Sequence, residues 1–245
     1  MTDERIHREL RLMRIYAGAS ALAIAWLGYA QLEGRGATEF DTIRVARIDV
    51  VSASGLPALS IAGHGRLPGP TFEGREYPRE LSGGRTVASG MIFFNEKGDE
   101  VGGLTYHGHL TEDGFSSYGG VTFDQFQQDQ VVSLQYQGSE DDRRAGVHVW
   151  DRNPDVSVLE ILDLVSARRA ASGAALDSIE SRIAALAARG GSAHRIFLGS
   201  ENRAAMLRLE DTGGRTRVRM YVDSTDVARL EFLDANGRVV GAYPG

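Results

Sequence analysis

The densest group of polar side chains between apolar segments lies at residues 123–130. It contains Asp124, Gln125, Asp129 and Gln130. Two carboxylates on either side of a turn can converge, where they could exchange protons with a substrate or bind a cation. The same side chains can instead satisfy backbone donors in a tight connection or hydrogen-bond across a subunit interface. We favour this structural interpretation, because spacing alone fixes no catalytic geometry. The four residues are therefore interaction candidates.

A pair of histidines, His107 and His109, is the second candidate for chemistry. In an extended strand both imidazoles lie on one face, which is a usable spacing for metal ligands, and His148 or Glu112 could supply a third ligand. Histidines in a glycine-rich hairpin are more often ordinary surface residues. We therefore name them only as weak metal candidates and predict no cofactor.

Neither nucleophile nor phosphate-loop motifs are present. The glycine-rich and serine-containing segment 114–120 does not match G-x-S-x-G, and the paired glycines do not precede a helix as a phosphate loop would. We assign no catalytic residue, and we favour an interaction protein over an enzyme.

Composition excludes several further classes. The formal net charge is −6 and the pI is about 5.6, which argues against a nucleic-acid partner, since phosphate binding needs a basic face. The chain has no cysteine, so a disulfide scaffold, a thiol nucleophile, a Cys-ligated metal site and a lipoprotein anchor are all excluded.

The elements that must position these residues begin with an uncharged apolar segment at residues 15–32. As a helix it spans about 27 Å, close to the thickness of a bilayer's hydrocarbon core. Four arginines in residues 1–14 precede it, which favours a cytoplasmic N-terminus and export of the chain after the helix. We favour an uncleaved signal anchor over a signal peptide cleaved near 28–30, because the apolar segment is too long. The sequence thus predicts a single-pass protein of a bacterial inner membrane, with a periplasmic domain.

Small residues recur every fourth position within this helix, at Ala17, Ala21 and Ala25. Such a stripe lets two helix backbones approach closely in lipid, so these alanines are candidates for packing between membrane helices.

The remaining chain reads as mainly β with an inserted helical hairpin. After a polar linker at 33–39, alternating apolar residues predict a first β region at 40–152 and a C-terminal array of antiparallel hairpins at 192–245. Between them, residues 153–191 have helical spacing and end at Gly190-Gly191. Whether the strands close into a sandwich, a barrel or a prism is left open.

Local signals locate several elements within these regions. Residues 40–52 predict a long bent strand, and the proline- and glycine-rich segment 63–90 predicts an irregular loop. Ser157 and Glu160 have the spacing of a capping box. Asp-x-x-Gly sequences at 211–214 and 234–237, and the related Asn-Glu-Lys-Gly at 95–98, predict hairpin turns.

Three sequence blocks resemble those of bacterial proteins that have a short N-terminal membrane segment, a β-rich remainder and no assigned activity. The blocks are Phe93-Phe94-Asn95 followed by Gly98, Glu100 and Gly102-Gly103-Leu104; Phe123-Asp124-Gln125 with Asp129-Gln130; and Trp150-Asp151-Arg152. The resemblance runs from about residue 40 to the end. It implies membrane location and a β-rich architecture, and it carries over no functional residue.

Together these features predict a membrane-anchored, extracytoplasmic scaffold or interaction module. Its expected partner is a second copy of itself or another envelope protein. One alternative is a ligand- or glycan-binding domain, with stacking surfaces at Tyr106, Tyr118, Phe126 and Tyr136. Another is a hydrolase that uses either Asp124 with Asp129 or a metal held by His107 and His109.

Overall fold

The computed structural model describes residues 3–33, 39–189 and 192–243. The chain divides into two compact units, residues 1–44 and residues 45–245. The first unit contains the helix α1 (Asp3–Glu33), of which His7–Tyr29 is long and apolar enough to cross a membrane. The apolar helix predicted over 15–32 is therefore present. The predicted linker 33–39 lies, apart from its two ends, outside the described residues.

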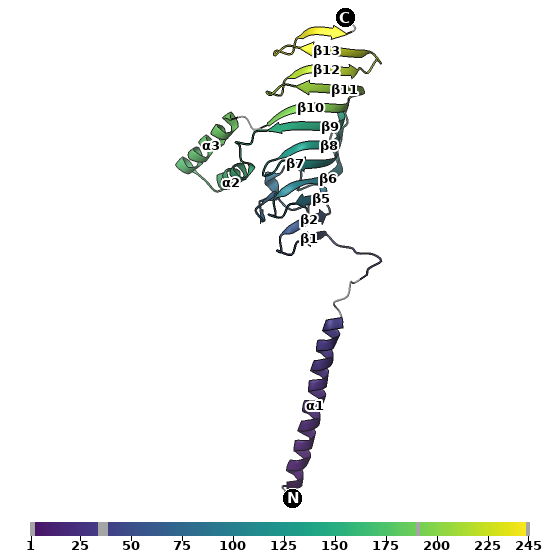
Figure 1. Ribbon diagram of the computed structural model, residues 1–245, viewed down its shortest axis with the longest axis vertical. Coiled ribbons are helices and arrows are strands. Elements are labelled where there is room, and N and C mark those ends of the chain that lie inside the picture. Colours follow the sequence, from purple (N-terminus) through teal and green to yellow (C-terminus); the bar gives the residue numbers. More distant parts are fainter. Residues whose placement is uncertain (1–2, 34–38, 190–191, 244–245) are drawn as a thin grey trace. The chain divides into compact units, whose positions relative to one another are not determined.

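Twelve strands of the second unit form one antiparallel sheet whose order follows the chain (Figure 1). Among the described residues the first and last of these strands each pair on one side only, so the sheet is open and not a closed barrel. The mainly β prediction is thereby confirmed. The strands of the sheet are β1 (Arg47–Val51), β2 (Pro57–Ala62), β5 (Ser89–Phe94), β6 (Glu100–Thr111), β7 (Gly114–Asp124), β8 (Gln130–Ser139), β9 (Arg143–Arg152), β10 (Ser192–Glu201), β11 (Ala204–Glu210), β12 (Thr216–Val222), β13 (Ala228–Leu233) and β14 (Val239–Tyr243).

The predicted hairpin turns share one hydrogen-bonding pattern. After β11, Asp211 Oδ1 accepts from the backbone N–H groups of Gly213 (2.9 Å) and Arg215 (3.1 Å). Three further turns repeat this pattern, and they begin at Asn95, Asp223 and Asp234. The fourth turn residue has a positive φ, which glycine adopts without strain. It is glycine in three of these turns and Asp226 (φ 66°) in the other.

The first strand is shorter than predicted. Residues 40–52 alternate like a strand, but β1 includes only Arg47–Val51, with a bulge between Val50 and Val51. The reason is the partner: Arg47 pairs with Ala62, the last residue of β2. After one more hydrogen bond, from the Gly63 N–H to the Ala46 carbonyl oxygen at 3.2 Å, the partner chain turns away.

The segment between β2 and β5, predicted as an irregular loop, contains a small hairpin. It is formed by β3 (Thr71–Phe72) and β4 (Arg75–Glu76), and the short 3₁₀ helix η1 (Arg79–Leu81) follows.

The second insertion is the predicted helical hairpin between β9 and β10. It consists of α2 (Val158–Arg168) and α3 (Gly173–Ala188). The predicted cap forms, since Ser157 Oγ accepts from the backbone N–H of Glu160 at 3.2 Å. The predicted stop at Gly190-Gly191 lies outside the described residues.

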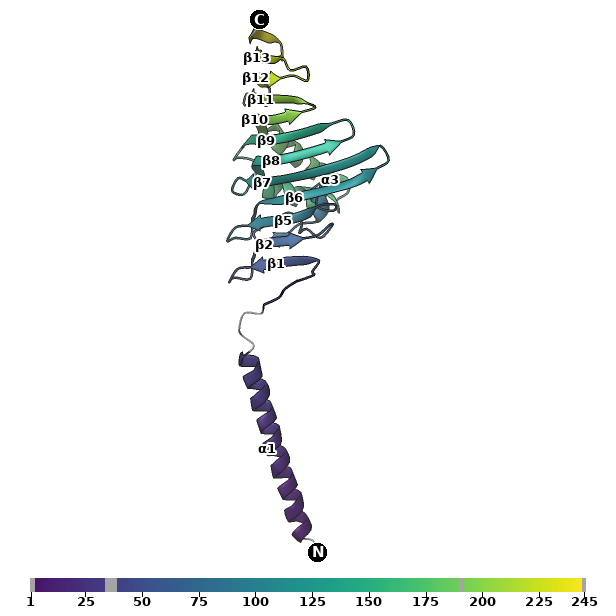
Figure 2. The same ribbon diagram turned by 90° about the vertical axis from the view of Figure 1, so that its right-hand side faces the viewer.

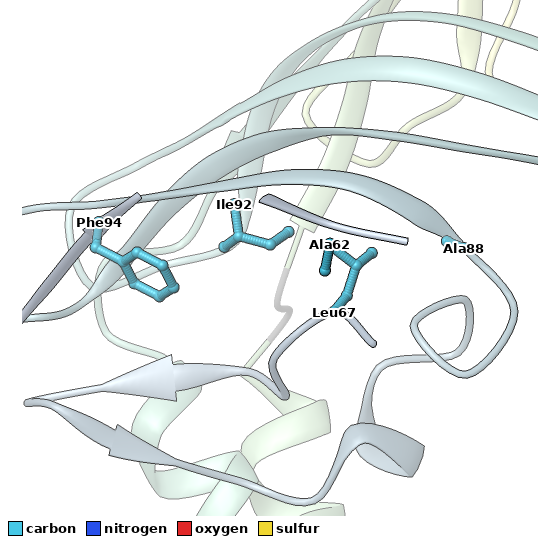
Figure 3. Packing of buried hydrophobic residues seen from close by; sticks show 5 residues of the cluster. All are labelled: Ala62, Leu67, Ala88, Ile92 and Phe94. Atoms are coloured by element: carbon cyan, nitrogen blue, oxygen red, sulfur yellow. The ribbon is translucent and has the colours of Figure 1, made fainter. Parts of the chain in front are cut away.

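Both insertions lie on one face of the sheet, which we call the covered face (Figure 1). Figure 3 shows the cluster beneath the first insertion, where Leu67 from the loop packs on Ile92 of β5. Phe72 and Tyr77 of the first insertion in turn pack on Leu162 of α2. The hydrophobic core is therefore made between the sheet and its insertions.

The opposite face, which we call the bare face, has no helix or hairpin in front of it among the described residues of the second unit. Figure 2 looks onto this face, and the strands follow one another without a second layer.

Candidate functional site

The predicted polar cluster lies in the turn that joins β7 to β8. The backbone N–H of Gln125 donates to the Asp129 carbonyl oxygen at 3.2 Å, which brings Asp124 and Gln130 opposite each other as a register pair. The neighbouring Gln128 donates from Nε2 to the Val156 carbonyl oxygen at 2.6 Å. The four candidate residues therefore lie at one turn between β7 and β8, and this turn is tied to the segment that leads into α2.

Three of the four candidates, Asp124, Asp129 and Gln130, line a cavity of about 300 Å³ on the covered face. They line it together with Glu100 of β6, Arg85 of the first insertion and Leu162 of α2. A second cavity of about 290 Å³ adjoins it and shares three of these residues, Arg85, Glu100 and Gln130.

Sequence reasoning missed the two residues that organise this cavity. Arg85 forms a short ion pair with Glu100, and it also donates to the Pro68 carbonyl oxygen at 2.8 Å and to Ser82 Oγ at 3.1 Å. Both partners of the ion pair are largely buried. Only contacts across the fold reveal the pair, because Arg85 lies in an irregular segment without a recognisable motif.

Burial and like charges act together on the carboxyl of Asp124. Burial raises the pKa of Asp124, and the nearby carboxylates of Glu100 and Asp129 raise it too; with the partial offset from Arg85 and Arg152, the pKa of Asp124 is about 7. Asp124 Oδ1 is buried and has no hydrogen-bond partner within the described residues. A carboxyl in this state can either donate or accept a hydrogen bond near neutral pH, which is the property of a proton-exchanging or ligand-binding group.

Asp129 has a different role from Asp124. Its Oδ1 accepts from the backbone N–H of Gln130 at 2.9 Å, and its Oδ2 lies 3.5 Å from Arg152 Nη2. Both oxygens thus have partners in the turn and the adjoining strand.

The two predicted histidines do share a face of β6. The rings of His107 and His109 lie 5.5 Å apart, and His107 stacks on Tyr118 at 5.9 Å. Burial lowers the pKa of His107, and the neighbouring histidines His109 and His64 lower it further. Among the described residues no group of three or more His, Cys, Asp or Glu side chains comes together as a metal site.

The third candidate ligand, His148, belongs to a separate polar chain on the covered face. Its Nδ1 lies 3.0 Å from Nε2 of His194, whose Nδ1 lies 3.0 Å from Glu210 Oε2. Trp150 stacks on His148 at 5.5 Å. This chain joins β9, β10 and β11, and sequence reasoning missed it because its members are 16 and 46 residues apart.

The bare face presents an unbroken apolar row across the whole sheet, which we call the central row. Each strand contributes one residue, and consecutive members are register partners. The central row consists of Ile48, Ile61, Met91, Leu104, Val121, Leu134, Val147, Leu198, Leu207, Met220, Leu230 and Tyr243.

A second row runs beside it, two residues along each strand, and we call it the outer row. It consists of Val50, Leu59, Phe93, Gly102, Phe123, Val132, Val149, Ile196, Leu209, Val218, Phe232 and Gly241. Neither row contains a charged residue.

Six of the twelve side chains in the central row are exposed, and the other six are partly exposed. None of them is buried, and Leu134, Leu198 and Met220 are 61%, 55% and 52% exposed. A shallow apolar depression of about 610 Å³ lies among the row members of the last five strands. Twelve strands spaced about 4.8 Å apart make each row roughly 50 Å long, so the two rows cover roughly 700 Å². This exceeds the roughly 300–600 Å² of the largest apolar patch on a typical monomer.

The predicted alanine stripe occupies one side of α1. Ala17, Ala21 and Ala25 follow at four-residue spacing, and their side chains are exposed within this unit.

Comparison with protein-family models, curated proteins and solved structures finds no match to this chain.

Proposed function

We propose that the protein is a membrane-anchored interaction module whose binding surface is the bare face of its sheet, and that it works as a homo-oligomer. The observation that supports this most is the central row, which is apolar at every one of the twelve strands and uncovered. Large exposed apolar patches mark sites of interaction with protein or membrane.

The energetics favour a covered state of this face. At about 25 cal/mol per Å², removing roughly 700 Å² from water contributes about 17 kcal/mol before costs. Association costs about 4–15 kcal/mol in lost freedom, so a complementary surface has a net driving force.

The helix α1 supplies the anchor in this proposal. Arginines precede its apolar segment, at positions 5, 8, 11 and 14, which favours a cytoplasmic N-terminus. The sheet then lies on the extracytoplasmic side of the bacterial inner membrane, where a second copy or another envelope protein meets the bare face.

The absence of cysteine allows a direct test of both location and coverage. Leu198→Cys places a thiol in the central row, and Gln137→Cys places one at an exposed position on the other face. Spheroplasts that carry the full-length protein are treated with a membrane-impermeant maleimide. We expect labelling of Gln137→Cys and protection of Leu198→Cys until the protein is denatured.

Two results would contradict the proposal. Equal labelling of both variants would mean that the bare face is free. Labelling of Gln137→Cys only after the membrane is permeabilised would mean that the sheet is cytoplasmic.

A ligand-binding domain is the second candidate, and the cavity beside Asp124 favours it. The aromatic residues proposed for sugar stacking do not gather there: Tyr118 lines the adjoining cavity, whereas Tyr106 and Tyr136 lie in register on the bare face. A small polar ligand therefore fits this alternative better than a glycan chain. A thermal-shift screen with small amines, sugars and divalent ions tests it, and a shift that Asp124→Asn abolishes would support it. The hydrolase alternative stays a prediction.

A further inference from the structure

We propose that the occupant of the bare face is the bare face of a second copy of this chain, packed as a two-layer sandwich in which each strand lies across the same strand of its partner. This inference rests on the proposed function, because it names the partner of that surface.

The chemistry of the surface is complementary to itself. Both rows are uncharged, so a second copy places no unpaired charge in the interface, and a two-fold axis makes the same patch serve on both sides. Two sheets pack face to face about 10 Å apart with their strands roughly 30° from parallel, and two sheets of the same twist stay in contact along their length.

The size of the surface also fits a dimer. Roughly 700 Å² from each copy gives roughly 1,400 Å² in total, which lies within the 1,200–2,000 Å² range of stable protein interfaces. A second copy would cover both rows along the entire sheet, from Ile48 in β1 to Tyr243 in β14.

A lipid surface fits less well. Helices that lie in the membrane interface have tryptophan, phenylalanine or leucine on the face that enters the lipid and basic residues on the other face. The two tryptophans of this chain are elsewhere: Trp26 is in α1, and Trp150 stacks on His148 on the covered face.

The anchors select one of two possible orientations. A two-fold axis parallel to the strands would place β1 of one copy opposite β14 of the other, at opposite ends of a sheet roughly 50 Å long. An axis that runs across the strands, midway between the two rows, places β1 opposite β1 and each row of one copy opposite the other row of its partner. Both membrane helices join the sheet through the segment before β1. Only the second orientation lets both chains leave the dimer from the same end toward one membrane.

Crosslinking through single cysteines distinguishes these orientations. In the proposed dimer Leu198 lies near Leu198 of the partner subunit, and Met220 lies near Met220 of the partner subunit. In the other orientation Met220, in the third strand from one edge, would lie opposite Met91 in the third strand from the other edge. Full-length Leu134→Cys, Leu198→Cys, Met220→Cys and Gln137→Cys proteins in membranes are treated with a short, uncharged bismaleimide. This reagent can partition into an apolar interface that excludes the charged, membrane-impermeant maleimide. Covalent dimers are measured on denaturing gels.

We expect strong dimer bands for Leu198→Cys and Met220→Cys and none for Gln137→Cys. A band for Leu134→Cys near the sheet centre without one for Met220→Cys would overturn the proposed orientation. Equal bands for all variants would indicate random collision and overturn the dimer. Leu230→Cys, in the same row, replaces any variant whose circular dichroism shows loss of fold.

The maleimide experiment separates failure of this inference from failure of the proposed function. Protection of Leu198→Cys without any crosslink means that something other than a second copy covers the face, which overturns the dimer and leaves the interaction module. Free labelling of Leu198→Cys overturns both.

Discussion

Ser133 and Leu134 are adjacent in β8 and point to opposite faces, yet the serine is 1% exposed and the leucine 61% exposed. The serine hydroxyl is buried without a hydrogen-bond partner among the described residues, while the leucine lies in the central row. The two faces do not differ simply by being polar and apolar. In β10 both Phe197 and Leu198 are apolar, yet Phe197 on the covered face is 0% exposed and Leu198 on the bare face is 55% exposed. What distinguishes the faces is their cover: within the described residues of the second unit, one face has the insertions in front of it and the other has none (Figure 1).

A charge in the central row should dissociate the proposed dimer. Leu134→Glu would bury an unpaired carboxylate from each copy, and leaving a charge unpaired in an interface costs about 2–5 kcal/mol, or roughly a 30-fold or larger loss of affinity. The fold should persist, because Leu134 is mostly exposed within one chain. Sedimentation of the full-length protein in detergent measures the effect.

The matched control is Gln137→Glu, on the same strand and the opposite face, which should leave association unchanged. Dissociation by both variants to the same degree would assign the effect to net charge rather than to the bare face.

The sequence predicted elements whose signals are local. The alternation of β8, the Asp211 turn and the Ser157 cap each depend on residues within a few positions, and all three form as expected. Alternation identifies two faces of a strand but not which of them is covered, since the cover comes from residues 63–88 and 158–188 elsewhere in the chain. The bare face was therefore not predictable.

The candidate site also combines a feature that has a local sequence signal with one that depends on distant residues. Asp124 and Asp129 share one turn, and their spacing predicted that they would be close. The pKa of Asp124 depends on Glu100 and Arg85, which reach it only through the pairing of β6 with β7 and the path of the first insertion. Its unusual ionisation had no local signal.

Replacement of Asp124 should change how stability depends on pH. The folded protein retains the Asp124 proton up to pH about 7, whereas the unfolded chain releases it near the ordinary value of 3.8. The unfolded state therefore binds fewer protons between these values, and wild-type stability falls as pH rises from about 4 to 7, by up to about 4 kcal/mol for this group.

We expect Asp124→Asn to weaken this fall and to raise the melting temperature at pH 8 relative to wild type. Glu100, whose pKa burial also raises, leaves part of the slope in place. Asp129→Asn is the control, and an unchanged pH profile in Asp124→Asn would refute the assigned burial.

His148 should act in the opposite direction over an overlapping pH range. Burial, together with the neighbouring His194, lowers the pKa of His148 to about 4. The unfolded chain protonates this histidine below pH about 6.5, so stability is lost as pH falls from 6.5 to 4, by about 3 kcal/mol for this group.

In His148→Asn the amide can still donate toward His194, and the acid-dependent loss should shrink. Urea unfolding at a series of pH values from 4 to 8 measures it. An equally steep acid loss in the variant would assign the effect to other groups.

One turn should be improvable, because its fourth residue is not glycine. Asp226 has φ 66°, a left-handed conformation that costs an L-residue energy, whereas Gly214 and Gly237 occupy the equivalent positions of two other turns. The Asp226 side chain is exposed. The hydrogen bonds of the turn come from the backbone N–H of Asp226 to the Asp223 carbonyl oxygen at 3.0 Å and from backbone N–H groups to the Asp223 side chain.

Asp226→Gly removes the strain but adds freedom to the unfolded chain, so the free energy of unfolding should rise by about 0.5 kcal/mol. The reverse change, Gly237→Ala, should cost about 1 kcal/mol. Chemical denaturation measures the free energy of unfolding of both variants. A lower value for Asp226→Gly than for wild type would contradict the prediction, because it would show that the Asp226 side chain stabilises the turn.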